Sequence, residues 1–139
     1  MIHDFLKRHE GLRLKPYTCS QGFLTIGYGR NLEHVGITKQ EADYLFVNDV
    51  TRATNGAMRV YGERFGDLAP ARQGALIAMV YQLGEEGLAG FKDMLAFARA
   101  GDWQRAYEEA LESRWATQTL NRAHETATML LTGEWPAGV

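Results

Sequence analysis

The segment from His9 to Arg30, HEGLRLKPYTCSQGFLTIGYGR, constrains the fold most, because the spacing of its apolar residues changes along it. Up to its start, apolar residues recur at helical spacing, which predicts an amphipathic helix over residues 2–10. Gly11 is the expected end of that helix, because glycine commonly follows the last helical turn. The helix therefore ends with Glu10, and the chain leaves it in another conformation.

Beyond this helix the apolar spacing approaches two, which predicts strands. Pro16 and the polar run at 18–22 mark a turn between two short strands within residues 12–28. A third short strand is expected near residues 30–32. A sheet this small is not stable by itself, so it must pack against a helix.

The rest of the chain carries helical signals. Thr38 and Glu41 form the T-x-x-E pattern of a capping box, which predicts the start of a helix of about fifteen to twenty residues. Asn55 and Gly56 are its expected interruption or end. The next predicted helix, 70–83, is apolar nearly all round, which is typical of a buried helix. Further predicted segments are a connector at 61–65, helices at 91–100, 102–112 and 121–131, a turn at 114–118 and a loose tail at 134–139.

Together these elements predict an α+β fold in a single domain over residues 1–139. A small antiparallel sheet lobe is expected at about 12–37, followed by a long connecting helix at about 38–54. A mostly helical lobe is expected at about 60–133, and it also receives the helix at 2–10. An active-site cleft is expected between the lobes, because ligand sites tend to form there.

Charge and residue usage exclude several classes of function. A formal net charge of −2 and a pI near 6.1 give no global attraction to nucleic acid. With one cysteine and four histidines at no metal-ligand spacing, the sequence predicts no disulfide framework, no metal and no cofactor. No apolar run reaches the ~18 residues of a membrane span, so no stable membrane insertion is expected. We expect a monomer.

Three side chains that can do chemistry, those of Glu10, Cys19 and Thr25, lie close together in the sequence. Each has a plain structural interpretation when taken alone: a solvated glutamate, a small hydrophobe and a strand residue. A glutamate followed by two turn-bounded strands nevertheless suggests a polar ligand site.

The stretch HEGLRLKPYTCSQGFLTIGYG resembles the active-site region of the phage lysozymes of the T-even type, glycoside hydrolase family 24. Their pattern is E-x8-[D or C]-x5-T, and Glu10, Cys19 and Thr25 meet its spacing at every position. The resemblance covers nearly the whole chain. It continues in ITKQEADYLFVNDV, in QGALIAMVYQLGEEGLAGF and in ESRWATQTLNRA.

The resemblance implies a lysozyme-like fold and hydrolysis of the β-1,4 bond between N-acetylmuramic acid and N-acetylglucosamine in peptidoglycan. It implies that Glu10 protonates the leaving oxygen. The residue at the second position activates water on the opposite sugar face, Thr25 helps to place that water, and the outcome resembles inversion. It also implies that Arg122 pairs with the catalytic glutamate and that Tyr81 and Gln82 face the cleft and contact sugar.

Cys19 stands where the best-known members of the family have aspartate, which sets a protonation problem. A free thiol titrates near ~8.5 and an acid suited to this reaction near ~6, so the protonated acid and the thiolate would coexist in roughly 0.3% of molecules. Three hypotheses follow. Cations such as Arg13, Lys15 or an arginine of the helical lobe lower the pKa of the thiol, so that its thiolate activates water; the thiolate attacks carbon directly, with retention; or Thr25 and water carry the step.

The connection at 30–37 is shorter than in the T-even enzymes, so the lower lip of the cleft, from which that loop would contact the peptide stems, is expected to be smaller. The favoured interpretation is an endolysin-type muramidase acting on peptidoglycan glycan strands. Charges at positions 4, 7, 8 and 10 exclude a signal-peptide core, so the chain is expected in the host cytoplasm, reaching the wall through a separate membrane lesion. The alternatives are a degenerate lysozyme that binds peptidoglycan without cutting it, and an enzyme for a related polymer such as chitin.

Overall fold

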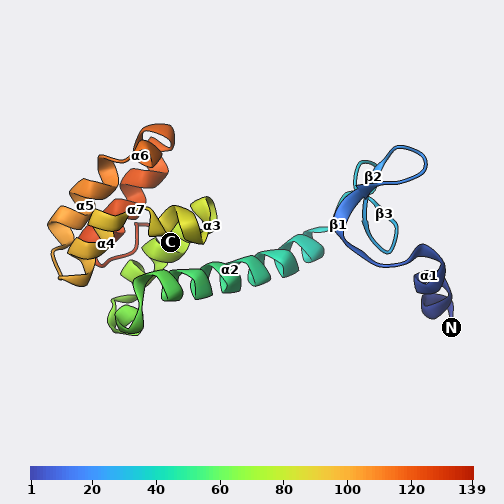
Figure 1. Cartoon of the computed structure of the whole chain (residues 1–139), viewed down its shortest axis with the longest axis horizontal. Helices are drawn as coiled ribbons and strands as arrows, with labels where there is room; N and C mark the ends of the chain where they lie inside the picture. Colours follow the sequence, from blue (N-terminus) through green and yellow to red (C-terminus); the bar gives the residue numbers. More distant parts are fainter. The chain divides into compact units, whose positions relative to one another are not determined.

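The computed structural model describes residues 1–139, and the chain divides into two compact units. The first unit is Met1–Leu45 and the second is Phe46–Val139. The helix α2, Lys39–Tyr61, begins in the first unit and ends in the second. Figure 1 labels the helices and strands along the chain.

The first unit holds a short helix and a three-stranded antiparallel sheet (Figure 1). The helix α1 spans Ile2–Glu10, as its apolar spacing predicts. The strands are β1 (Arg13–Thr18), β2 (Leu24–Gly27) and β3 (Arg30–Asn31), in the order β1-β2-β3. The predicted hairpin and third strand are therefore confirmed.

The edge strand β1 pairs irregularly with β2. Arg13 is opposite Gly27 and Tyr17 is opposite Thr25, and the register shifts between these two pairs. Pro16 lies in the shifted stretch, and because proline has no N–H it cannot donate to the ladder. An edge strand with a bulge and a proline is also a poor template for pairing with another sheet.

The short connection from β3 to α2 is fixed by side chains at its two ends. Asn31 Oδ1 accepts hydrogen bonds from the backbone amides of Glu33 and His34, both at 3.0 Å. Arg30 Nη1 donates to the Gly36 carbonyl and to Glu41 Oε1, also at 3.0 Å. These hydrogen bonds order the connection although it contains no helix.

The predicted capping box at the start of α2 is confirmed. Thr38 Oγ1 accepts a hydrogen bond from the Glu41 amide at 3.1 Å, and Glu41 Oε1 accepts one from the Thr38 amide at 3.0 Å. Each side chain thus satisfies a backbone N–H that the helix leaves without a partner.

The predicted break at Asn55 and Gly56 is wrong, because α2 continues without interruption to Tyr61. Gly56 is buried, and a Cβ built on it would lie 3.0 Å from Val80 Cγ1 in α3. This glycine therefore allows close packing of α2 on α3. A glycine in mid-helix lowers the helix propensity, but its missing side chain lets the two helices approach each other.

The remaining elements of the second unit lie close to their predicted positions. The predicted helix at 70–83 corresponds to the first part of α3, which bends at Gly84, where φ is 79°. The elements are the 3-10 helix η1 (Glu63–Asp67), α3 (Pro70–Ala89), α4 (Lys92–Arg99), α5 (Trp103–Leu111), α6 (Arg114–Gln118) and α7 (Leu120–Thr132).

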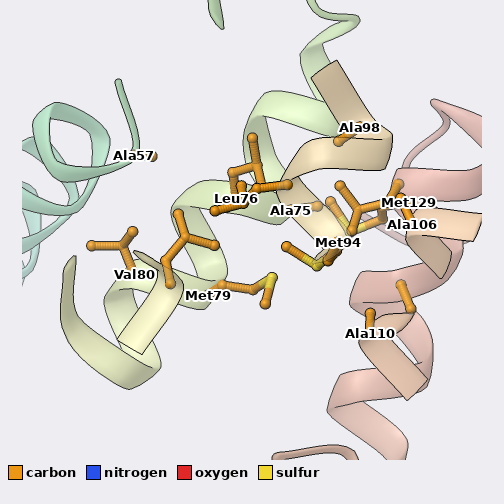
Figure 2. Close-up of a cluster of buried hydrophobic side chains, with 14 of the residues drawn as sticks. Ala57, Ala75, Leu76, Met79, Val80, Met94, Ala98, Ala106, Ala110 and Met129 are labelled. Atoms are coloured by element: carbon orange, nitrogen blue, oxygen red, sulfur yellow. The ribbon is translucent and has the colours of Figure 1, made fainter. Parts of the chain in front are cut away.

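Helix α3 supplies the centre of the second unit's core, as predicted. Leu76 and Met79 are fully buried, and Figure 2 shows them beside Met94 of α4 and Met129 of α7. The facing positions on α5 are alanines, among them the fully buried Ala106. Small residues there let the helices approach while long methionine side chains fill the space between them.

The predicted loose tail at 134–139 is wrong at its start. The Trp135 ring lies so close over Gly74 that a Cβ on this glycine would overlap the indole. The preceding residues are also held, because Arg72 Nε and Nη2 donate to the carbonyls of Leu130 and Leu131 at 2.8 and 3.0 Å. The end of α7 is thus attached to α3 by an aromatic contact and two hydrogen bonds.

None of the helices combines the length and the apolarity that crossing a membrane requires. The assignment of the first helix to the helical lobe, and the cleft between lobes, stay predictions.

The ion pair at the start of α2 makes a pH-dependent contribution to stability. The Arg30 guanidinium, with help from Thr38, lowers the pKa of Glu41 to about 2, below the ~4.3 of an unfolded glutamate. Because the folded pKa is the lower one, the contribution is complete above pH ~4.3 and is lost as the pH falls to about 2. In Glu41→Gln this loss should be absent when unfolding of the first unit is followed by NMR against pH.

Asp43→Asn is the matched control, because exposed Asp43 pairs with Lys39 within the same helix. Its acid dependence should equal that of the wild type. Parallel acid curves for the wild type and Glu41→Gln would contradict the assigned role of this pair.

Candidate active site

The loop between β1 and β2 determines the position of Cys19. The Cys19 amide donates to the Phe23 carbonyl, and the Gly22 amide donates to the Cys19 carbonyl, both at 2.9 Å. Gly22 has a φ of 88°, in the left-handed region where glycine has no steric cost. This is a short hairpin loop with glycine at its last turn position.

The backbone amides of this loop lower the pKa of the Cys19 thiol below its ordinary value. The Phe23 amide has the largest effect and the Gln21 amide the next, and partial desolvation opposes them. The Thr25 hydroxyl and the Gly22 amide add smaller decreases. Asp and Asn at the start of a turn accept hydrogen bonds from the same kind of loop amides. The loop therefore favours a negatively charged acceptor at position 19.

The sequence suggested that nearby cations, among them Arg13 and Lys15, lower the pKa of the Cys19 thiol. Neither Arg13 nor Lys15 contributes to the pKa of the thiol. The Arg13 guanidinium lies instead over the Tyr17 ring, 4.7 Å from its centroid. For these two residues the hypothesis of a cation beside the thiol is wrong, and fixed amide dipoles take its place.

Thr25 is the buried polar residue of β2, with a side chain next to Cys19. Its Oγ1 donates to the Phe23 carbonyl at 2.9 Å. A hydroxyl has one hydrogen, so it cannot serve this carbonyl and a thiolate at the same time. While it donates to Phe23, its lone pairs remain to accept a hydrogen from the thiol or from a water.

Glu10 is the last residue of α1, and its carboxylate lies against Gly29 in the turn between β2 and β3. A Cβ on Gly29 would be 2.6 Å from Glu10 Oε2 and 3.2 Å from Cδ. The structure thus places Glu10, Cys19 and Thr25 in the same small unit, with Cys19 and Thr25 in direct interaction.

Tyr81 and Gln82 lie together near the bend of α3 in the second unit. Gln82 Oε1 accepts a hydrogen bond from Trp115 Nε1 at 2.9 Å, and its Nε2 donates to Thr119 Oγ1 at 3.4 Å. Tyr81 is half-exposed and packs edge-on against Phe46, with ring centroids 6.0 Å apart. Gln82 is therefore held rigidly, while the Tyr81 ring stays available to a ligand.

Arg122 lies exposed near the start of α7. Its pairing with Glu10 and the sugar contacts of Tyr81 and Gln82 stay predictions. No group of three or more His, Cys, Asp or Glu side chains is arranged to hold a metal ion.

Sequence reasoning missed two backbone features of the site. One is the amides of Gln21 and Phe23 that face the thiol, and the other is the space that Gly29 leaves for Glu10. The loop length and Gly22 pointed to a tight turn, but residue types alone do not show where backbone N–H groups are directed.

Residues 7–127 match the family described as Phage lysozyme. The chain is 34% identical over 158 residues to the pre-baseplate central spike protein Gp5 of Enterobacteria phage T4, covering 94% of this chain and 27% of that protein. It is 29% identical over 160 residues to probable T4-type lysozyme 1 of Dictyostelium discoideum, covering 95% and 94%. It is 28% identical over 123 residues to an endolysin of Acyrthosiphon pisum secondary endosymbiont phage 1, covering 84% and 77%.

The chain thus spans about a quarter of the spike protein but most of the two lysozyme-like relatives. The first two alignments are longer than the 139 residues of the chain, so this chain lacks segments that those relatives contain.

Titration of Cys19, followed by the ultraviolet absorbance of its thiolate, should give a pKa below the ~8.5 of a free thiol. Because backbone amides cause the shift, Arg13→Gln and Lys15→Gln should leave the pKa unchanged. Thr25→Val should raise the pKa of the thiol, because it removes a hydroxyl whose hydrogen can turn from the Phe23 carbonyl to the sulfur once the thiolate forms.

Thr18→Val is the control for that last variant, because Thr18 is an exposed residue of β1 that plays no part in the shift. A thiol pKa at or above ~8.5 in the wild type, or a large increase in Arg13→Gln, would contradict the backbone origin of the shift.

Proposed function

Because the chain belongs to the phage lysozyme family, we propose that it hydrolyses the glycan strands of peptidoglycan as a lysozyme. The bond cut in this proposal is the β-1,4 bond between N-acetylmuramic acid and N-acetylglucosamine. The observation that supports it most is the Cys19 loop, which favours negative charge at the position where the reaction needs a base. The resemblance of the E-x8-C-x5-T spacing supports the same roles.

In the proposed reaction, Glu10 gives its proton to the glycosidic oxygen as the bond from anomeric carbon to that oxygen breaks. The Cys19 thiolate takes a proton from a water whose oxygen attacks the anomeric carbon from the opposite face. Thr25 orients this water by accepting its other hydrogen, which suits a hydroxyl whose own hydrogen is directed to the Phe23 carbonyl. The products are two shorter glycans, and the configuration inverts.

The substitution of cysteine for aspartate keeps the geometry of the loop but changes the pH at which the base is available. Amides that stabilise a carboxylate also stabilise a thiolate, since both groups are negatively charged and accept hydrogen bonds. Water activation by Cys19 is therefore preferred over direct attack on carbon, and over a reaction that depends on Thr25 alone.

The proposal extends to the place of action. The protein is made in the cytoplasm of a bacterial host and acts on the wall after a separate protein opens the membrane. Tyr81, Gln82 and Arg122 are proposed to contact the substrate or the catalytic glutamate, and the protein to act as a monomer.

Activity of matched variants on permeabilised cells tests the proposal. Glu10→Gln should lower the rate by about 10²- to 10⁴-fold, the usual contribution of a general acid. Cys19→Asp should retain activity, because a carboxylate accepts hydrogen bonds from the same loop amides. Cys19→Ala and Cys19→Ser should lose most of the activity. The serine variant separates the structural role of position 19 from its role as a base, because serine still accepts a hydrogen bond in the turn but carries no charge. Loss of turbidity and release of reducing sugar are the measurements.

Asp4→Asn is the control, because it removes an exposed carboxylate from the same helix. Full activity in Cys19→Ala would exclude the thiolate from the reaction. A wild type that sediments with purified wall but leaves the suspension turbid would instead be a binding protein. Reducing sugar released from chitin rather than peptidoglycan would change the substrate.

The stereochemistry of the first product distinguishes water activation from direct attack. Proton NMR of the first-formed anomer should show inversion, because water reaches the carbon from the face opposite the leaving oxygen. Retention would contradict water activation and favour the alternative in which the Cys19 sulfur attacks the anomeric carbon and forms a covalent intermediate.

A further inference from the structure

The last turn of α1 meets the turn between β2 and β3 at two points. Lys7 Nζ lies over the Tyr28 ring, 5.2 Å from its centroid. One helical turn further on, the Glu10 carboxylate lies against Gly29. Two successive contacts therefore align the end of the helix with residues 28–29.

Gly29 differs from the other glycines of this unit in what surrounds it. Its φ is 74°, and a Cβ built on it would lie 2.6, 3.2 and 3.6 Å from Glu10 Oε2, Cδ and Cγ. Gly22, Gly27 and Gly36 also have positive φ, of 88°, 69° and 64°, but a Cβ on any of them would have nothing within 4 Å. Backbone conformation alone favours glycine at all four positions. At Gly29 there is a second reason, because the Glu10 carboxylate lies where a side chain would be.

We propose that Gly29 is a positioning residue for Glu10, whose carboxylate occupies the space that a side chain at position 29 would fill. The contact of Lys7 with Tyr28 holds the same helical turn in register. The role in catalysis rests on the proposed function, in which Glu10 is the acid, whereas the contact between Glu10 and Gly29 does not.

A displaced acid is costly, since a misplacement of about 1 Å can lower a rate ~10²-fold. A methyl group at position 29 cannot coexist with the present position of the carboxylate, so the side chain must move or the turn must open. The consequence should appear in kcat rather than in KM, because Glu10 acts on the bond that breaks.

The first experiment measures stability and needs no activity. Denaturant unfolding is compared for Gly29→Ala and for the control Gly36→Ala, each with Glu10 present and in the Glu10→Ala background. With Glu10, the midpoint should fall only slightly further in Gly29→Ala than in Gly36→Ala, because the Glu10 carboxylate is the far end of an exposed, flexible side chain that moves aside at low cost. In Glu10→Ala the two midpoints should fall equally, because only the strain remains. An excess effect of Gly29→Ala that persists without Glu10 would overturn the proposal.

The second experiment measures peptidoglycan hydrolysis. Gly29→Ala should lower kcat ~10²-fold with KM little changed, while Gly36→Ala keeps the activity of the wild type. Equal kcat in Gly29→Ala and Gly36→Ala would overturn the positioning role. An inactive wild type would instead refute the proposed function, and the stability experiment would still decide whether Glu10 occupies this space.

Discussion

The convergence of loop amides on the Cys19 side chain is the interaction on which this account of the site depends. The loop closes through two backbone hydrogen bonds, and its glycine takes the left-handed conformation that the turn requires. The amides of Phe23 and Gln21 are then fixed by the chain itself, so they stabilise a negative sulfur without help from Arg13 or Lys15. A site of this kind can exchange aspartate for cysteine, because the loop interacts with the charge and not with one functional group.

The two units support their candidate residues by different means. In the first unit, turn glycines and short hydrogen-bonded connections position the candidate residues, and Thr25 is the residue that is buried. In the second, a packed helical core surrounds α3, and Gln82 is held by Trp115 and Thr119. Rigid side chains on a helix and fixed amides in a tight loop both reduce the reorganisation that binding or reaction would otherwise require.

Most of the helices and strands could be predicted from the sequence because their signals are local. The capping box of Thr38 and Glu41 and the strand turns lie within a few residues of the structure they determine. Two features could not be predicted, because each depends on a residue that is distant in the sequence. The helix continues through Gly56, which packs against Val80, and Trp135 is held against Gly74. The same limit applies to the site: residue spacing identified Glu10, Cys19 and Thr25, but not the amides or Gly29 that position them.

The pH dependence of peptidoglycan hydrolysis by the wild type and by Cys19→Asp tests the central claim most directly. If Cys19 acts as the thiolate, activity of the wild type should rise as its thiol loses a proton. In Cys19→Asp the acidic limb should move to lower pH by more than one unit, because an aspartate titrates near ~3.9. Superimposable acidic limbs in the two proteins would show that ionisation at position 19 does not control the reaction, and would contradict the account.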